Sequence, residues 1–85
     1  MMIKQLSTQN EVVNVYLYKN TNINYLMLAI PDIFWSLEVS LDMNLNEIEE
    51  ELVMHIFNFK DEEEATRIAS ILINWIAEYL KETNK

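Results

Sequence analysis

The chain of 85 residues contains no glycine and one proline, and this restricts the turns that it can form. Glycine adopts positive φ angles at little cost, and many tight turns require such angles. Without glycine, asparagine or aspartate has to occupy the left-handed positions, or the turns have to avoid them. Asparagine is frequent between the apolar segments, for example at Asn20, Asn22 and Asn44. We therefore expect a single domain, residues 1–85, whose regular elements are joined by short asparagine-containing turns.

The first half of the chain has the pattern of β-strands. Three segments qualify: residues 13–18, 25–30 and 33–41. In the first and third, apolar side chains recur at every second position, which is typical of strands. Pro31 ends the second segment, because proline lacks a backbone N–H. The short connections favour an antiparallel meander of three strands. The first ten residues are ambiguous, because Ile3 and Leu6 fit either a short strand or the covering of a sheet edge.

The second half has the three- and four-residue spacing of two amphipathic helices. Asn44 is the expected N-cap of the first, and Asp61 with Glu64 three residues later marks the start of the second. The apolar stripe of the first helix consists of Leu45, Ile48, Leu52, Ile56 and Phe59. The predicted fold class is α+β: a three-stranded antiparallel meander followed by two helices packed on one face (β-β-β-α-α).

The net charge of −8 is concentrated around the two predicted helix starts. Residues 42–64 contain nine acidic residues and one basic residue, whereas acidic and basic residues balance in the remainder of the chain. The acidic patch comprises Glu47, Glu49, Glu50, Glu51, Asp61, Glu62, Glu63 and Glu64. One interpretation is that these carboxylates stabilise helix N-termini. The other is that they imitate a nucleic-acid backbone or dock on a basic protein, although antiparallel helices would separate the two starts by about 20 Å.

Several classes of function conflict with the composition. The six basic residues are scattered, so we expect no direct binding to nucleic acid or to an anionic membrane. Cysteine is absent, which excludes disulfides, thiolate zinc sites and cysteine nucleophiles. The first residues lack the apolar core of a signal peptide, and no apolar run approaches the length of about 18 residues that spans a membrane. We expect a cytoplasmic protein.

Candidate catalytic groups are few. His55 is the single histidine, and Glu51 precedes it by four residues, so the two side chains can meet on one helix face. A hydrolytic metal site usually needs three protein ligands, and no second histidine is present. Phosphate-binding loops need glycine, and the serines lack the context of a nucleophile. We therefore expect no enzyme activity, no metal and no cofactor, and a half-buried His55 in contact with Glu51.

More apolar side chains are present than one small core requires. On the second helix they cover about 200° of the helical wheel, whereas burying one face needs a stripe only a little over 100° wide. The surplus residues are Val53, Met54 and Phe57 on the first helix, Tyr16, Tyr18, Tyr25, Met27 and Phe34 on one sheet face, and Ile71 and Trp75 on the second helix. Either the N-terminal segment and loops cover them, or they form an interface, for which Tyr, Phe and Met are typical residues.

Three segments of the sequence resemble one protein family. VYLYKN, YLMLAIPDIFWSLEV and the tryptophan-containing IASILINWIAEYL are similar to the YueH-like proteins, over roughly Val12 to Leu80. The most specific part is AIPDIFWS, Ala29 to Ser36. The resemblance implies a small bacterial cytoplasmic protein, and it carries no catalytic residues to transfer.

These observations lead to three hypotheses about function. The first is a small non-catalytic protein-interaction module that forms a homodimer or docks on another protein through the surplus apolar residues. The second is an acidic inhibitor that blocks a basic nucleic-acid-binding protein. The third is a small-molecule binder with a cleft between the tyrosine-rich sheet face and the N-terminal segment. Electrostatic inhibition would weaken steeply with salt, and apolar docking would not.

Overall fold

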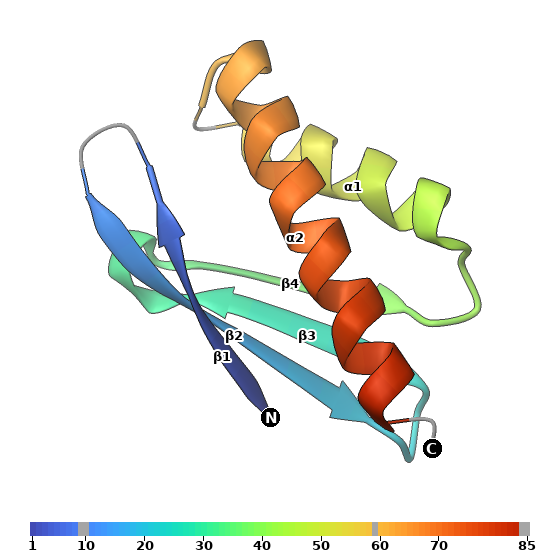
Figure 1. Cartoon of the computed structure of the whole chain (residues 1–85). Helices are drawn as coiled ribbons and strands as arrows, with labels where there is room; N and C mark the ends of the chain where they lie inside the picture. The colour runs from blue at the N-terminus through green and yellow to red at the C-terminus, as the bar shows by residue number, and fades with distance from the viewer. Residues whose placement is uncertain (9–10, 59, 84–85) are drawn as a thin grey trace. The chain divides into compact units, whose positions relative to one another are not determined.

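Over the residues that the structure describes, the chain folds as an α+β protein with four strands and two α-helices (Figure 1). The computed structural model describes residues 1–8, 11–58 and 60–83, so Phe59 of the predicted stripe lies outside the described residues. The elements are β1 (Met2–Ser7), β2 (Val12–Asn20), β3 (Tyr25–Ile30), the short 3-10 helix η1 (Pro31–Ile33), β4 (Trp35–Ser40), α1 (Leu45–Phe57) and α2 (Glu62–Thr83). They divide into a sheet unit, Met1–Asp42, and a helix unit, Met43–Lys85.

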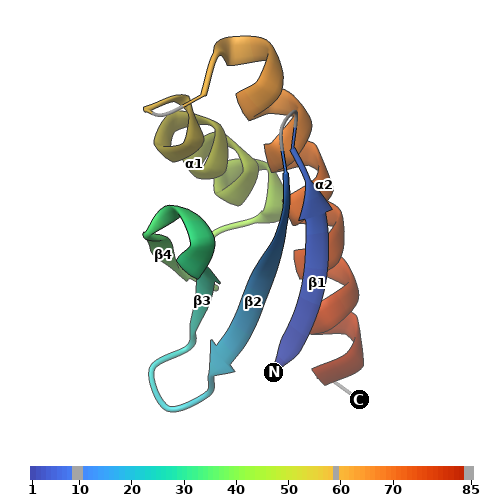
Figure 2. The same cartoon turned by 90° about the vertical axis from the view of Figure 1, so that its left-hand side faces the viewer.

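The sheet is an antiparallel meander in the order β1-β2-β3-β4. The predicted meander is confirmed, but the prediction of three strands is wrong, because residues 2–7 form a further strand beside β2 (Figure 2). Its register pairs Met2 with Leu17 and Ser7 with Val12. The sequence pattern missed β1 because Lys4 occupies the middle of the side that also carries Met2 and Leu6. A lysine there interrupts the alternation on which the prediction depends.

One face of the sheet supplies the core of the sheet unit. Cross-strand pairs such as Leu17 with Leu28 place apolar side chains opposite each other on this face. Its buried residues are Leu6, Val13, Val15, Leu17, Leu26, Leu28, Ile30 and Val39. Trp35 and Leu37 lie on the same face, as expected, and are partly exposed. The opposite face is open, with exposed side chains from β2 and β3.

The turns show how the chain manages without glycine. Asn24 has a φ angle of 55°, and its amide Nδ2 donates a hydrogen bond to Asp42 Oδ1 at 3.2 Å. This confirms that an asparagine takes a left-handed turn position. Among the described residues, Phe34 is the other one with positive φ, at 53°. The prediction placed Ile33 and Phe34 in the third strand, and this is wrong: Pro31 begins a 3-10 turn, and the Phe34 N–H donates to the Pro31 carbonyl at 3.0 Å.

Both helix starts are confirmed at the predicted residues. Asn44 forms a capping box with Glu47: the Glu47 N–H donates to Asn44 Oδ1 at 2.9 Å, and the Asn44 N–H donates to Glu47 Oε1 at 3.0 Å. At α2, the Glu64 N–H donates to Asp61 Oδ1 at 2.8 Å. Each cap satisfies backbone donors that the first helical turn would otherwise leave without a partner.

The two helices contact each other and form a hairpin (Figure 1). Buried residues of α1 repeat at intervals of four, and those of α2 follow the same helical spacing. They are Ile48, Leu52 and Ile56 in α1, and Ala65, Ile68, Ala69, Leu72, Ile76 and Tyr79 in α2. That the helices pack on one face of the sheet stays a prediction.

Candidate interaction surfaces

The open face of the sheet carries an exposed apolar surface, which we call the tyrosine face: Tyr16, Tyr18, Tyr25 and Met27. The register places Tyr18 beside Met27, and these side chains are 46% and 41% exposed. A shallow hollow of about 390 Å³ lies here, lined by Met1, Tyr16, Tyr18, Met27, Ala29 and Pro31. Antiparallel pairing therefore joins aromatic and Met side chains from two strands into one surface.

Some residues of this surface were not predicted. Met1 and Pro31 line the hollow, and Ile3 extends the face because it pairs with Tyr16 and is exposed. The sequence pattern missed Met1 and Ile3 because it did not identify β1. The signal for them was weak: Ile3 and Leu6 fit either a short strand or the covering of a sheet edge, and the apolar run at the start is too short to decide.

Phe34 is 99% exposed, and it lies in the turn after η1 instead of on the strand face where it was predicted. A bulky residue in the left-handed region costs about 1–2 kcal/mol. Full exposure means that burial of the ring does not offset this cost. The side chain is thus presented to solvent by a backbone conformation that its residue type disfavours.

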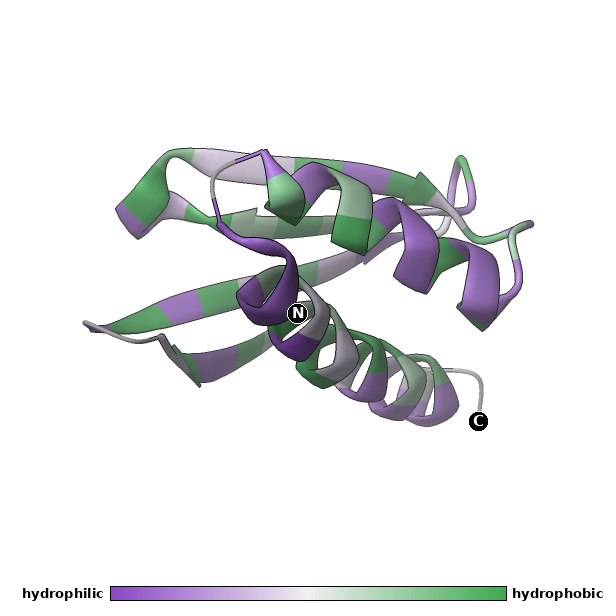
Figure 3. Cartoon of the chain, turned by 90° about the horizontal axis from the view of Figure 1, so that it is seen from above, coloured by the Kyte–Doolittle hydropathy of each residue, from purple (hydrophilic) through white to green (hydrophobic). Residues whose placement is uncertain are grey.

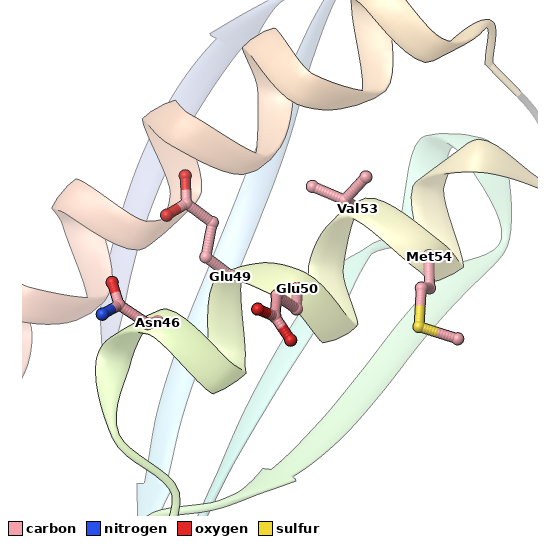
Figure 4. Close-up of a pocket in the computed structure, with 5 residues that line it drawn as sticks. All are labelled: Asn46, Glu49, Glu50, Val53 and Met54. Carbon is pink, nitrogen blue, oxygen red and sulfur yellow. The ribbon is translucent and has the colours of Figure 1, made fainter.

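The outward side of α1 carries a second exposed apolar surface, the outer strip: Val53, Met54 and Phe57. Met54 is 66% and Phe57 is 53% exposed, and Val53 is partly exposed. Two shallow hollows adjoin the strip. One is lined by Asn46, Glu49, Glu50, Val53 and Met54, and the other by Val53, Met54, Phe57 and Glu62. Figure 4 shows Val53 and Met54 one turn beyond Glu49 and Glu50 on the same helix.

The acidic patch does not form one surface. The first turns of both helices are hydrophilic (Figure 3) and lie at opposite ends of the hairpin. With 13 residues in α1, that separation is about 20 Å. Glu47 and Asp61 serve as helix caps. The carboxylates thus belong to at least two separate sites, and several of them stabilise local structure.

Glu64 is the clearest departure from the expected patch. Its relative exposure is 6%, so it does not belong to an acidic surface. Its Oε1 accepts hydrogen bonds from Arg67 Nε, at 2.7 Å, and from Arg67 Nη2. A buried carboxylate needs such a partner because desolvation penalises an unpaired charge. The seven other members of the patch are partly or fully exposed.

The surplus of apolar residues on α2 is smaller than its helical wheel predicted. Ile71 and Trp75 are only partly exposed, whereas the outer strip residues Met54 and Phe57 are both more than half exposed. The wheel counts apolar residues without showing how deeply each one packs. The exposed apolar surface of the helix unit therefore lies mainly on α1.

His55 contacts Glu51 as expected: Nε2 lies 3.5 Å from Glu51 Oε2, and both side chains are close to half exposed. Within the described residues, no group of three His, Asp or Glu side chains is placed to hold a metal ion. Over the same part of the chain, neither helix is long and apolar enough to cross a membrane.

The meander and the helix hairpin define a small α+β protein. A family model for YueH-like proteins matches residues 2–78. The chain therefore belongs to the YueH-like protein family, as the resemblance of its sequence predicted. Neither a curated protein nor a solved structure matches it significantly.

Proposed function

We propose that this protein is a small, non-catalytic protein-interaction module that self-associates through the tyrosine face. The observation that carries the proposal is the exposure of Tyr18, Tyr25 and Met27 together on the open side of two paired strands. Monomers seldom leave such contiguous apolar surface in water, and tyrosine and methionine are enriched where proteins meet.

The distribution of charge favours a second copy as the occupant of this face. The open side of β2 and β3 carries no charged residue, and the nearest carboxylate there is Glu38 on β4, opposite Met27. A two-fold interface brings the same surface of each copy together, so a charged surface would oppose itself. The tyrosine face reduces that repulsion, because its own residues are uncharged and Glu38 adjoins it from β4 alone. The outer strip does not, because glutamates adjoin it.

The absolute mass in solution tests this proposal. Light scattering behind size exclusion, at micromolar concentration and moderate salt, should give about twice the chain mass of 10.1 kDa. The double change Tyr18→Glu with Met27→Glu should return the mass to that of one chain, because it places carboxylates opposite each other at the centre of the interface. Far-ultraviolet circular dichroism checks that the variant is folded.

Met54→Glu is the matched control. It places one carboxylate at an exposed methionine of α1, which belongs to the helix unit and is not part of the tyrosine face. It should leave the doubled mass unchanged. A monomeric wild-type chain, or a dimer that survives the Tyr18 and Met27 changes and dissociates with Met54→Glu, would overturn the proposal.

A second candidate function is the binding of a small apolar ligand. The hollow of about 390 Å³ favours it, because Met1 joins the tyrosine side chains in its lining and the volume falls in the range of ligand sites. A thermal-shift screen of small aromatic compounds tests this candidate, since a ligand that binds the folded state raises the melting temperature. A hit should lose its effect in Tyr16→Ala and keep it in Phe57→Ala. Equal shifts in both variants would contradict a site in this hollow.

A further inference from the structure

The outer strip has a composition that the helix hairpin itself does not explain. At 100° per residue, Val53, Met54 and Phe57 fall within about 100° of one another on the helical wheel. The buried stripe of Ile48 and Leu52 lies on the other side. Solvent-facing helix positions normally carry polar residues. Here a methionine that is 66% exposed and a phenylalanine that is 53% exposed take those positions.

Carboxylates stand at both ends of the outer strip. Glu49 and Glu50 lie one turn before it on α1, and Glu62 lies beside Phe57 at the start of α2 (Figure 4 shows the first two). The capping bonds and the Arg67 ion pair use other carboxylates of the helix unit. Within the described residues, the structure assigns these three glutamates no cationic partner. The strip is therefore an apolar patch between two anionic ends.

We propose that the outer strip is the docking site for a basic amphipathic helix of another protein. Apolar side chains of such a helix would cover Met54 and Phe57, and lysine or arginine at its ends would face the glutamates. The distance along α1 from residue 49 to residue 57 is about 12 Å, at 1.5 Å per residue. Cationic residues roughly two turns apart on the partner helix would have the same spacing. Methionine adapts its shape to varied apolar partners. Grooves of this kind recognise helices through anchors at three- and four-residue spacing.

Charge complementarity selects this occupant over the alternatives. A second copy would bring carboxylates against carboxylates in either orientation, because both ends of the strip are anionic, and an acidic segment would meet the same repulsion. A cation without apolar side chains would leave Met54 and Phe57 in water. This site differs from the tyrosine face in place and in partner, so the inference goes beyond self-association and does not depend on it.

The test uses three synthetic 18-residue peptides of defined sequence and the full-length chain. The first peptide is a leucine–lysine amphipathic helix, the second is its scrambled sequence with the same charge, and the third is the amphipathic helix with glutamate in place of lysine. Affinity is measured by isothermal titration calorimetry, and the contact is mapped by amide chemical shifts. We expect the first peptide to bind, with shifts centred on residues 50–57, and the others to bind at least about tenfold more weakly.

Neutral substitutions separate the apolar contribution from the electrostatic one. Met54→Gln and Phe57→Gln leave the charge unchanged and should each weaken the first peptide about tenfold. Glu49→Gln with Glu50→Gln should weaken it and also reduce the loss of affinity between about 0.05 and 0.3 M salt. Tyr18→Glu with Met27→Glu should leave the affinity unchanged whether or not the chain self-associates.

Three results would overturn the inference. In the first, the scrambled peptide binds as tightly as the amphipathic one, so that charge alone drives association. In the second, the glutamate peptide binds equally well. In the third, Met54→Gln and Phe57→Gln retain full affinity although circular dichroism shows that the variants are folded. Because the Tyr18 and Met27 changes test self-association separately, failure of one proposal is distinguishable from failure of the other.

Discussion

At the scale of single residues, the two left-handed positions in the described part of the chain differ in how well their residue types suit them. Asn24 takes its positive φ in a turn, where asparagine is tolerated and its side chain also bonds Asp42. Phe34 takes the same conformation with no such advantage, and its ring is 99% exposed. Strain of this kind persists where the surrounding structure imposes it, and it is frequent at functional positions. Phe34 is therefore a candidate anchor for a partner.

Phe34→Asn should raise the free energy of unfolding by about 1 kcal/mol, because asparagine accepts the left-handed conformation more readily. Urea denaturation of the variant carrying Tyr18→Glu and Met27→Glu checks this without the contribution of self-association. If Phe34 also anchors the interface, the same change in the wild-type background should shift the dimer toward monomer. A loss of stability would show that the exposed ring stabilises the folded chain.

The matched change Asn24→Ala should act in the opposite direction. It removes the residue type suited to positive φ together with the hydrogen bond to Asp42. We expect the free energy of unfolding to fall by about 1 kcal/mol. If the free energy of unfolding falls for Asn24→Ala and rises for Phe34→Asn, both changes can be attributed to the left-handed backbone conformation at these positions.

At the scale of elements, local patterns predicted the helices better than the strands. Asn44 and Asp61 cap α1 and α2 because each side chain bonds a backbone N–H three residues later. Such contacts depend on a few neighbouring residues, so the sequence displays them directly. The backbone hydrogen bonds of strand β1 depend on pairing with β2, which the local sequence does not display. Lys4 also interrupts the alternation of apolar and polar residues in this strand. The turn at Phe34 was missed because no local preference indicates an aromatic residue with positive φ.

Asn44→Ala should lower the free energy of unfolding by about 1 kcal/mol, because the capping box of α1 loses the hydrogen bond that Asn44 Oδ1 accepts from the Glu47 N–H. Urea denaturation measures the change. Asn46→Ala is the control, since Asn46 is exposed in the same helical turn and takes no part in the cap. The capping argument requires a clear difference between the two variants, and equal losses would refute it.

At the scale of the whole molecule, the charge differs between the two halves of the sequence. Residues 1–42 contain four carboxylates and two lysines, whereas residues 43–85 contain ten carboxylates and four basic residues. The two proposed contacts differ in charge in the same way, since one lies in each half. Self-association through the weakly charged tyrosine face should change little with salt, and docking of a basic helix on α1 should weaken as salt screens Glu49 and Glu50.

The candidate surfaces were predictable in part. Periodicity indicated that Tyr18, Met27, Met54 and Phe57 point away from the apolar stripes, and all four are exposed. Periodicity does not report depth of packing or specific pairing. For that reason Glu64, which is buried and paired with Arg67, was assigned to the acidic patch.

The order of the elements has a consequence for how the chain reaches its fold. Every strand pairs with its neighbour in the sequence, and α1 packs against the helix that follows it. Such local connections cost little loop entropy, and chains built from them fold quickly. Each hairpin can form as soon as its second half leaves the ribosome. Newly made chains would therefore expose unfinished strand edges only briefly, which limits aggregation of a sequence that is 51% hydrophobic.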